Sequence, residues 1–404
     1  MTYFYWVAGT ILALIWISRV LDAAWGMPKV ADISRPEWDP ERRSEAPRQA
    51  RVSIIVPARN EQEHIAESLD RLLHLDYDNY EVIVVNDRSS DNTGERIAEV
   101  AARPEAVRRL KVIDLTELPN GWLGKVHAMW SGANDASGDW LLFTDADVLF
   151  RPDSLSRALF YAQSEQADHL VLLPRMIMHG PGERSAVAFF QTLFVFGHRP
   201  WKVADPKAKD HMGVGAFNLI RRPVYEALGT FETLRLEVLD DMKLGKLVKD
   251  GGYRQRNVFG HDLISLRWVK GITGMVDNLT KNFFALMSFE WPRALGSALV
   301  LAYLNLTPFL GIWLAAGWAR LPYAVALLSI FGIYLGMSTK SDVPAYYFVL
   351  HWASGVLFVY IMLSSMLLTL VRGGVVWRGT FYPLAELKNG SVSSKTRMNA
   401  SPSG

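Results

Sequence analysis

The sequence predicts an α/β domain flanked by membrane-spanning helices, and three observations lead to this fold class. Between residues 52 and 173, short apolar runs rich in β-branched residues alternate with helical patterns. This alternation is typical of a parallel sheet with helices on both faces and right-handed crossovers. The two ends of the chain are apolar and aromatic, whereas its middle has the composition of a soluble enzyme. The 404 residues are also too many for one ordinary domain.

The composition excludes several classes of function. The formal net charge is only +2, so nothing in the charge balance suggests a nucleic-acid partner. The chain contains no cysteine. This excludes disulfide bonds, thiolate metal sites and cysteine nucleophiles.

The elements of the α/β region follow from its periodicity. We expect strands at residues 52–56, 81–85, 110–113, 141–143 and 169–173, and helices at 61–73, 91–101, 125–136 and 153–163. Asp91 is a candidate N-cap of the second helix. A further apolar and aromatic stretch at 185–201 predicts either a helix at the membrane interface or a core helix.

The N-terminal segment is predicted to be a membrane anchor. Residues 3–25 supply the roughly 20 apolar residues that one crossing requires, with Arg19 near the boundary. A cleaved signal peptide is the alternative, but no lysine or arginine precedes Arg19. We therefore divide the chain into an anchor at 1–26, a proline-containing linker at 27–50 and a catalytic domain at 51–290. A membrane region at 291–372 and a cytoplasmic or disordered tail at 373–404 follow.

The C-terminal membrane region contains three long apolar stretches, at residues 293–319, 321–337 and 343–371. Together with the anchor they make four crossings, which place both termini on one side. Lysine and arginine are frequent in both the central domain and the tail. The positive-inside tendency favours the cytoplasmic side for both, which four full crossings forbid. One segment could therefore be re-entrant or interfacial.

Two aspartates end the buried strand at 141–143 and predict a cation site. Asp145 and Asp147 are two positions apart, so in extended chain they point the same way. Two like charges this close need a cation or hydrogen-bond donors between them. A divalent ion held by one or two carboxylates and by a substrate's phosphates is the usual solution. The alternative is that Asp145 caps the next helix and Asp147 is merely exposed.

Other polar residues follow the strands at the same edge of the sheet, where ligands bind in such folds. Glu61 begins a helix after the first strand, and Asp87 follows the second. A carboxylate such as Asp87 can accept hydrogen bonds from a base or a ribose, although a turn residue is the alternative. Lys125 follows Gly121 and Gly124 and suits a phosphate. A solvated lysine is the alternative there.

A second acidic pair, Asp240 and Asp241, begins a helix that continues to about Lys249. Asp240 suits an N-cap, which leaves Asp241 free to act as a general base toward an acceptor hydroxyl. The alternative is two capping carboxylates. Gly213 and Gly215 would let a ligand approach the backbone closely.

Arg267 and Trp268 follow an expected strand. The arginine could neutralise a leaving diphosphate, and the indole of the tryptophan could stack on a sugar.

Taken in order, these motifs resemble the family 2 glycosyltransferases. The resemblance covers residues 52–268 and rests on the segment 52–61, the Asn86-Asp87 motif, Gly124-Lys125, Asp145-Ala146-Asp147, Gly213-X-Gly215 and Asp240-Asp241. It implies the GT-A fold, a Rossmann-like mixed sheet that binds nucleotide sugars. The flanking membrane segments are similar to those of the lipid-glycosylating branch associated with hopanoids or carotenoids.

The resemblance also implies roles for single residues. Pro57, Ala58, Glu61, Asp87, Lys125, Asp145, Arg267 and Trp268 would bind the nucleotide sugar, Gly213, Gly215 and Asp240 would lie on the acceptor side, and Asp147 with Asp145 would hold Mg²⁺ or Mn²⁺. Asp241 would be the catalytic base of an inverting transfer. Arg267-Trp268 resembles the end of the Gln-X-X-Arg-Trp motif of processive enzymes. Because Ile264 replaces its glutamine, processive synthesis is not expected.

The expected function is the inverting transfer of a sugar from a UDP- or GDP-linked donor to a membrane lipid. The expected location is the bacterial inner membrane, with the catalytic domain in the cytoplasm, where nucleotide sugars occur. The alternatives are transfer to a polyprenyl phosphate, whose acceptor needs no strong base, and a silent membrane scaffold with the same fold.

Overall fold

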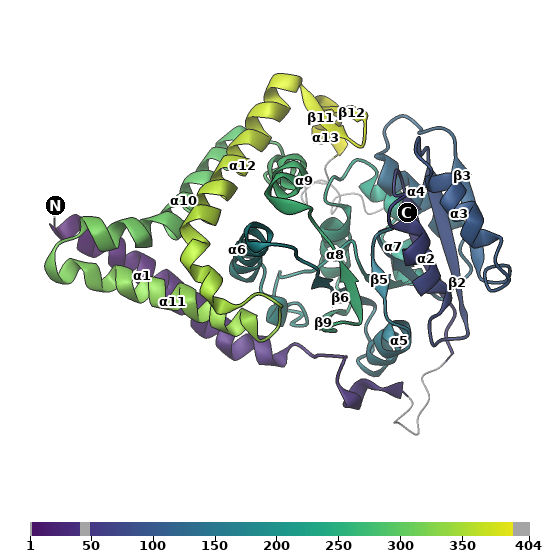
Figure 1. Cartoon of the computed structure of the whole chain (residues 1–404), viewed down its shortest axis with the longest axis horizontal. Helices are drawn as coiled ribbons and strands as arrows, with labels where there is room; N and C mark the ends of the chain where they lie inside the picture. The colour runs from purple at the N-terminus through teal and green to yellow at the C-terminus, as the bar shows by residue number, and fades with distance from the viewer. Residues whose placement is uncertain (1, 41–48, 391–404) are drawn as a thin grey trace, which may run out of the picture. The chain divides into compact units, whose positions relative to one another are not determined.

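The computed structural model describes residues 2–40 and 49–390, and the chain divides into two compact units (Figure 1). The helical unit consists of Met1–Ala31, Arg175–Asp210 and Arg267–Arg372. The sheet unit consists of Asp32–Pro174, His211–Leu266 and Gly373–Gly404. Each unit is therefore assembled from three separate segments, and the segment expected to form the catalytic domain, 51–290, contributes to both.

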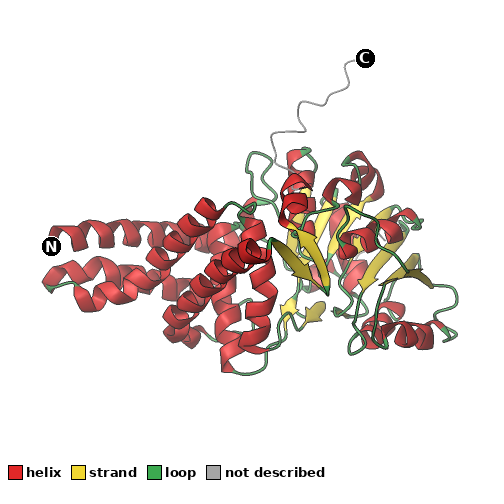
Figure 2. Ribbon diagram, turned by 90° about the horizontal axis from the view of Figure 1, so that it is seen from above, coloured by secondary structure: helices red, strands yellow, loops and turns green. Residues whose placement is uncertain are grey.

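The sheet unit is built on a seven-stranded mixed sheet with the order β3-β2-β1-β4-β8-β6-β9. Strands are drawn in yellow in Figure 2. Its strands are β1 (Val52–Ala58), β2 (Tyr80–Asp87), β3 (Leu110–Leu115), β4 (Trp140–Phe143), β6 (His169–Leu173), β8 (Asn218–Arg221) and β9 (Gln255–Phe259). β1 pairs in parallel with β2 and β4, whereas β8 is antiparallel to both β4 and β6. The predicted α/β fold class with a mixed sheet is confirmed.

The expected helices of this unit are present, with shifted ends. They are α2 (Ile65–Leu73), α3 (Thr93–Ala101), α4 (Gly124–Asn134), α5 (Ser154–Ser164) and α8 (Asp240–Asp250). A further helix, α7 (Arg222–Ala227), was not predicted. Gly132 brings α4 close to the sheet, since a Cβ there would lie 2.6 Å from a methyl group of Ile55. The prediction that Asp91 is the N-cap of α3 is wrong. That position is Asn92, and Asp91 instead accepts hydrogen bonds from the backbone and hydroxyl of Thr93.

Short strands complete the unit. β5 (Leu149–Phe150) pairs antiparallel with β10 (Ile264–Leu266), which is the strand expected before Arg267. β9 has no counterpart among the predicted strands. Its sequence alternates weakly, and it is extended because it pairs in parallel with β6.

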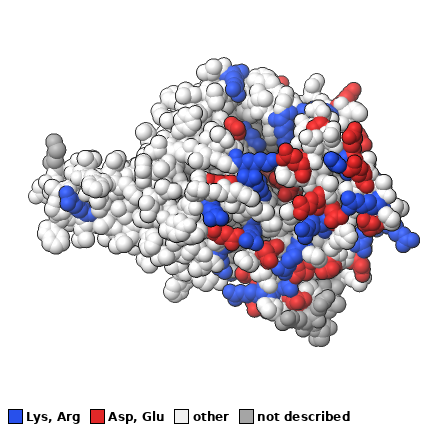
Figure 3. Space-filling view, viewed as in Figure 1, with Lys and Arg blue, Asp and Glu red and all other residues white. Residues whose placement is uncertain are grey.

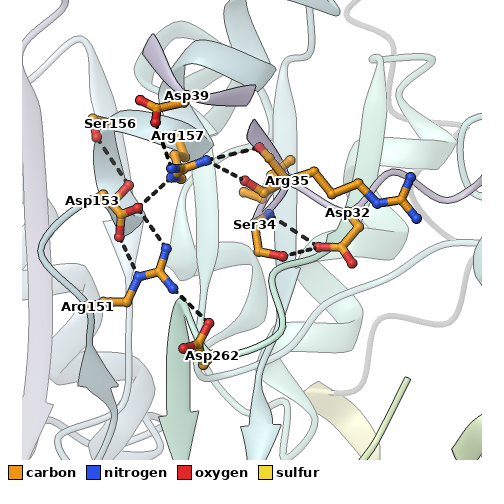
Figure 4. A network of polar contacts seen from close by, with 10 residues as sticks. Asp32, Ser34, Arg35, Asp39, Arg151, Asp153, Ser156, Arg157 and Asp262 are labelled. Atoms are coloured by element: carbon orange, nitrogen blue, oxygen red, sulfur yellow. Dashed lines mark hydrogen bonds and ion pairs between the residues drawn. The ribbon is translucent and has the colours of Figure 1, made fainter. Parts of the chain in front are cut away.

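Part of the predicted linker is bound to the sheet unit through Arg157 on α5 (Figure 4). The guanidinium group of Arg157 donates to Asp153 at 2.5 Å and to the backbone carbonyl of Arg35 at 3.1 Å, and it pairs with Asp39 at 3.2 Å. Ile33 is fully buried, and its backbone N–H donates to the carbonyl of Phe259. Residues 32–39 are therefore part of the packed unit. Residues 41–48 of the predicted linker lie outside the described residues.

The first part of the predicted tail is also folded. Gly374–Trp377 (β11) and Thr380–Pro383 (β12) form an antiparallel hairpin, which is followed by Leu384–Gly390 (α13). This C-terminal hairpin belongs to the sheet unit. It follows the end of the last apolar helix at Arg372 almost directly. Residues 391–404, for which disorder was expected, lie outside the described residues.

The helical unit contains four helices long and apolar enough to cross a membrane. They are α1 (Thr2–Gly26), α10 (Trp291–Leu314), α11 (Leu321–Ser338) and α12 (His351–Arg372), and the unit also contains β7 (Arg175–Met176), α6 (Pro181–Gly197) and α9 (Gly271–Leu286). α1 packs along α11, and α12 packs against α9 and α10. The sequence predicted α6 either as a helix at the membrane interface or as a core helix. In the structure it buries Val187 and Phe189 against α9 and α12.

Charged side chains are distributed unevenly between the two units. In the view of Figure 3, lysine, arginine, aspartate and glutamate gather over the sheet unit, and the surface of the apolar helices shows few charges. This matches the segregation of composition along the sequence. An uncharged helical surface is what contact with lipid requires.

Candidate active site

The first acidic pair lies directly after β4, at the carboxyl end of the central strands. The Nζ atom of Lys125, at the start of α4, lies 2.5 Å from a carboxylate oxygen of Asp145. The backbone N–H of Asp145 donates to the carbonyl of Gly215 at 3.0 Å. A lysine predicted to bind phosphate is thus held by one of the two aspartates predicted to bind metal.

The second acidic pair is connected to the first through the loop at Gly213–Gly215. The N–H of Gly215 donates to one carboxylate oxygen of Asp241 at 2.9 Å, and the N–H of Met242 donates to the other at 2.7 Å. A Cβ on Gly215 would lie 2.5 Å from a carboxylate oxygen of Asp145. A Cβ on Gly213 would lie 1.8 Å from the backbone oxygen of Asp241. Gly215 therefore lets the carboxylate of Asp145 approach closely, and Gly213 does the same for the backbone of Asp241; that the two glycines also admit a ligand stays a prediction.

Asp240 does not have the N-cap role predicted for it. The helix α8 begins at Asp240 itself, Leu239 occupies the cap position, and Leu239 makes no side-chain capping hydrogen bond. Asp240 is buried beside the other charged groups. Its position one residue into the helix therefore brings both aspartates of the pair to the same charged cluster.

Lys125 is the positive centre of this cluster. Burial favours its neutral form, but the carboxylates of Asp145, Asp240 and Asp241 outweigh burial and raise the pKa of Lys125. Burial raises the pKa of Asp240 to about 7. The positive charge of Lys125 lowers this pKa, and the negative charge of Asp241 raises it further. Burial likewise raises the pKa of Asp241, which Lys125 opposes. One lysine thus faces three aspartates. Burial, with a smaller contribution from the charge of Asp145, makes the Asp241 carboxylate more basic than that of a solvated aspartate.

Asp147 carries the excess charge that a cation would relieve. Burial, followed by the negative charges of Asp145 and Glu61, raises the pKa of Asp147 to about 7. Over the described residues, no three His, Cys, Asp or Glu side chains are grouped closely enough to enclose a metal ion. An ion held at Asp145 and Asp147 would take one or two carboxylates from the protein and its other oxygens from a bound diphosphate.

Asp87, at the end of β2, is buried and lies between two arginines that the sequence analysis did not identify. Arg88 binds both of its carboxylate oxygens, at 2.7 and 3.0 Å, and Arg59 lies 3.8 Å away. Arg88 has a left-handed backbone with φ of 52°, which turns its side chain back onto its neighbour. Only the basic character of the loops after the first two strands could have indicated this arrangement.

The loop after β1 is bound to the loop after β2. Pro57 and Ala58 form the buried end of β1. The N–H of Glu61 donates to the hydroxyl of Thr93 at 2.7 Å, and the carboxylate of Glu61 pairs with Arg378 of the C-terminal hairpin at 2.5 Å. Because Glu61 also acts on the charge of Asp147, the structure brings the predicted residues of the sheet unit to one edge of the sheet.

Arg267 and Trp268 belong to the helical unit. There, Arg267 pairs with the buried Glu183 at 3.4 Å, and the ring of Trp268 lies 4.4 Å from that of Phe190. Glu183 was not predicted, although its position three residues into α6 beside a proline is typical of a first helical turn. The roles of Arg267 and Trp268 toward a donor remain predictions.

Comparison with known proteins agrees with this geometry. Residues 53–229 match the family described as Glycosyl transferase family 2. A 4,4'-diaponeurosporenoate glycosyltransferase from Staphylococcus haemolyticus (strain JCSC1435) is 24% identical over 269 residues, which are 65% of this chain and 69% of that protein. The protein of the same name from Staphylococcus aureus (strain USA300) is 21% identical over 345 residues, 83% of this chain and 89% of that protein.

One solved structure shares the fold. A mannosyltransferase from Pyrobaculum calidifontis, in complex with GDP-Man and Mn²⁺, is 19% identical and superposes with a TM-score of 0.52. The match covers 90% of this chain and 99% of the mannosyltransferase. The GT-A fold that the motifs implied is confirmed.

Proposed function

Because residues 53–229 form a family 2 glycosyltransferase domain, we propose that this enzyme transfers a sugar from a nucleotide donor to a membrane lipid with inversion at the anomeric carbon. One observation carries the proposal. Lys125 binds Asp145, Gly215 contacts both Asp145 and Asp241, and so the predicted donor and base positions lie within one charged cluster. Packing of the core alone does not require three aspartates, one of them the buried Asp240, around one lysine.

The donor is a UDP- or GDP-linked sugar in this proposal. Asp87 and the loop after β1 would contact the nucleoside, and Lys125 would contact its phosphates. The similar mannosyltransferase is a complex with GDP-Man and Mn²⁺, which supports a divalent ion here too. Bound at Asp145 and Asp147, Mg²⁺ or Mn²⁺ would supply positive charge to the departing diphosphate.

The transfer itself would be a single displacement. The anomeric carbon gains positive character as the bond to the diphosphate weakens. Asp241 takes the proton of the acceptor hydroxyl as its oxygen attacks from the opposite face. The N–H groups of Gly215 and Met242 hold the Asp241 carboxylate in one orientation while its raised pKa keeps it basic.

The acceptor is expected to be a lipid for two reasons. The relatives from Staphylococcus carry a carotenoid acid in their names, and four helices of this chain are long and apolar enough for a membrane. We place the enzyme in a bacterial inner membrane with the sheet unit on the cytoplasmic side, where nucleotide sugars occur. Gly213, Gly215 and Asp240 would lie on the side of this acceptor.

The test uses purified full-length protein with UDP- and GDP-linked sugars, Mn²⁺ and extracted membrane lipids. The Asp241→Asn variant should lose about a hundredfold or more of its transfer rate, while binding of the nucleoside diphosphate persists. Asp250→Asn, an exposed position at the other end of α8 that pairs with Lys246, is the matched control and should retain the rate. Transfer by Asp241→Asn at the wild-type rate to a hydroxyl lipid would show that the base is another group.

Lipid analysis separates the remaining alternatives. Cells with and without the protein should differ in one glycolipid, which identifies the acceptor. Rapid transfer by Asp241→Asn to a polyprenyl phosphate would favour that carrier, since a phosphate oxygen needs no base. Binding of a nucleoside diphosphate without transfer to any extracted lipid would favour a silent scaffold.

A further inference from the structure

We propose that the C-terminal hairpin, β11 and β12, is part of the donor site and that Arg378 at its tip is a positioning residue that holds Glu61 for nucleotide-sugar binding. The proposal rests on the glycosyltransferase function proposed above. It adds a segment that lies more than a hundred residues beyond the end of the family match at residue 229.

The hairpin presents Arg378 at its tip. The strands pair from Gly374 with Pro383 to Trp377 with Thr380, which leaves Arg378 and Gly379 as a two-residue turn. Both turn residues have positive φ, 46° and 79°, as a type I′ turn requires. Asparagine, aspartate or glycine is the usual first residue of such a turn. An arginine there is uncommon, and it points to a role for its side chain.

Arg378 binds the loop that follows β1. One guanidinium nitrogen lies 2.5 Å from the carboxylate of Glu61, and the other donates to the backbone carbonyl of Arg59. The two contacts fix both the charged end of Glu61 and the backbone two residues before it. The fork geometry of a guanidinium makes this possible, because a lysine would reach only one of the two groups.

A second residue of the hairpin binds the other side of the site. Tyr382 is buried, and its hydroxyl oxygen accepts a hydrogen bond of 3.2 Å from the N–H of Gly124. Gly124 lies against the carboxylate of Asp87, since a Cβ there would be 2.5 Å from it. The hairpin therefore contacts the β1 loop through its tip and the first residue of α4 through β12.

The ion pair between Arg378 and Glu61 should affect the binding of the donor specifically. Glu61 adds negative charge near Asp147, and a diphosphate entering the site is itself an anion. Arg378 offsets the charge of Glu61 and fixes its orientation. Without Arg378, the donor would meet an unpaired carboxylate and a less ordered loop, while Asp241 and its backbone donors would be unchanged. The expected defect is thus in donor affinity rather than in the rate of the bound complex.

The test measures binding of UDP and of GDP, each with Mn²⁺, to full-length protein by calorimetry, together with the KM and kcat of transfer. For the nucleotide that the wild type binds, Arg378→Ala should raise the Kd about tenfold, because charge-assisted hydrogen bonds are lost. The KM for the donor should rise in parallel and kcat should change less than about twofold. Tyr382→Phe should raise the Kd by a smaller factor, and Arg378→Lys should recover part of the affinity.

Two controls exclude a merely structural effect. Val107→Ala changes an exposed side chain of the sheet unit outside the hairpin and should bind nucleotide and unfold as the wild type does. In a Glu61→Gln background, Arg378→Ala should have a much smaller effect on Kd, because the charge that it offsets is absent. Equal nucleotide binding by wild type and Arg378→Ala would overturn this inference and leave the glycosyltransferase proposal intact. Failure of the wild type to bind either nucleotide would overturn both.

Discussion

The sheet unit and the helical unit bury polar side chains in opposite ways. In the sheet unit, Lys125 is surrounded by Asp145, Asp240 and Asp241, and one positive charge faces three acidic groups. In the helical unit, the buried His351 contacts the hydroxyl of Tyr334 and the side-chain oxygen of Asn305, each at 3.1 Å. Asn305 in turn donates to the carbonyl of Leu301 at 2.8 Å.

The difference agrees with the proposal that the chemistry takes place in the sheet unit. Among the residues that the structure describes, no acidic or basic side chain joins the hydrogen bonds of His351, Tyr334 and Asn305. The members of this network satisfy one another, as a membrane interior requires. The cluster at Lys125 keeps an excess of negative charge that a substrate and a cation can use. A satisfied network contributes to stability, whereas an unbalanced cluster sacrifices stability for function.

The largest expected effect concerns membrane topology, because a segment is reached by a label from one side of the membrane or is not reached at all. The C-terminal hairpin contacts Glu61 and Gly124 and so lies on the same side of the membrane as the donor loops. Three candidate spans, α10, α11 and α12, separate it from Leu266, so an even number of them must cross fully. Four complete crossings, as counted from the sequence, are not compatible with these contacts.

Because the chain has no cysteine, single cysteines can be labelled without background. Val107 and Glu386 are exposed in the sheet unit and on α13. Val107→Cys and Glu386→Cys should react with an impermeant maleimide from the same side of sealed vesicles. Labelling from opposite sides would contradict the placement of the hairpin.

The next largest effect is expected at Gly213. A Cβ there would overlap the backbone of Asp241 at 1.8 Å, so Gly213→Ala must displace α8 from the cluster. We expect a loss of about 3 kcal/mol in the free energy of unfolding and loss of transfer. Gly296→Ala on α10 meets no atom within 4 Å and is the control for denaturation and activity assays. Wild-type stability of Gly213→Ala would contradict this close packing.

A smaller effect, on stability alone, is expected in the helical unit. His351→Ala leaves the Asn305 oxygen and the Tyr334 hydroxyl without their observed partner. It should cost about 1–3 kcal/mol, measured as a lower melting temperature in detergent. Nucleotide binding should be unchanged, because the network has no part in the charged cluster. A weaker nucleotide affinity would contradict the division of roles between the two units.

The smallest effect is the pH dependence of stability. The pKa of Asp240 is about 7 in the folded protein, above the usual aspartate value of about 4. The folded state therefore binds its proton more tightly, and stability should rise as pH falls from about 8 toward 5. We expect the melting temperature of the wild type to rise by a few degrees relative to that of Asp240→Asn in this range, because other groups such as Asp147 and His169 titrate in both proteins. A fall in the melting temperature of the wild type relative to that of Asp240→Asn over the same range would show that folding lowers the pKa of Asp240.

The sequence by itself determined the α/β class, most of the strands and helices, and the family. Local periodicity specifies an element, and the acidic motifs occur at strand ends because that is where such sheets bind ligands. Asp145 and Asp147 could be selected for this reason before any contact was known, and Asp241 because it belongs to an acidic pair that begins a helix. Strand β9 was missed, since its pairing with β6 and not its own pattern makes it extended.

Only the tertiary structure decided which charges meet. The pairs Arg88 with Asp87, Arg267 with Glu183 and Arg378 with Glu61 depend on turns and on returns of the chain that local patterns do not encode. The hairpin shows this most clearly, since 317 residues separate Arg378 from Glu61. An ion pair depends on distance in space, and over such a separation the sequence fixes that distance only through the packing of the whole fold.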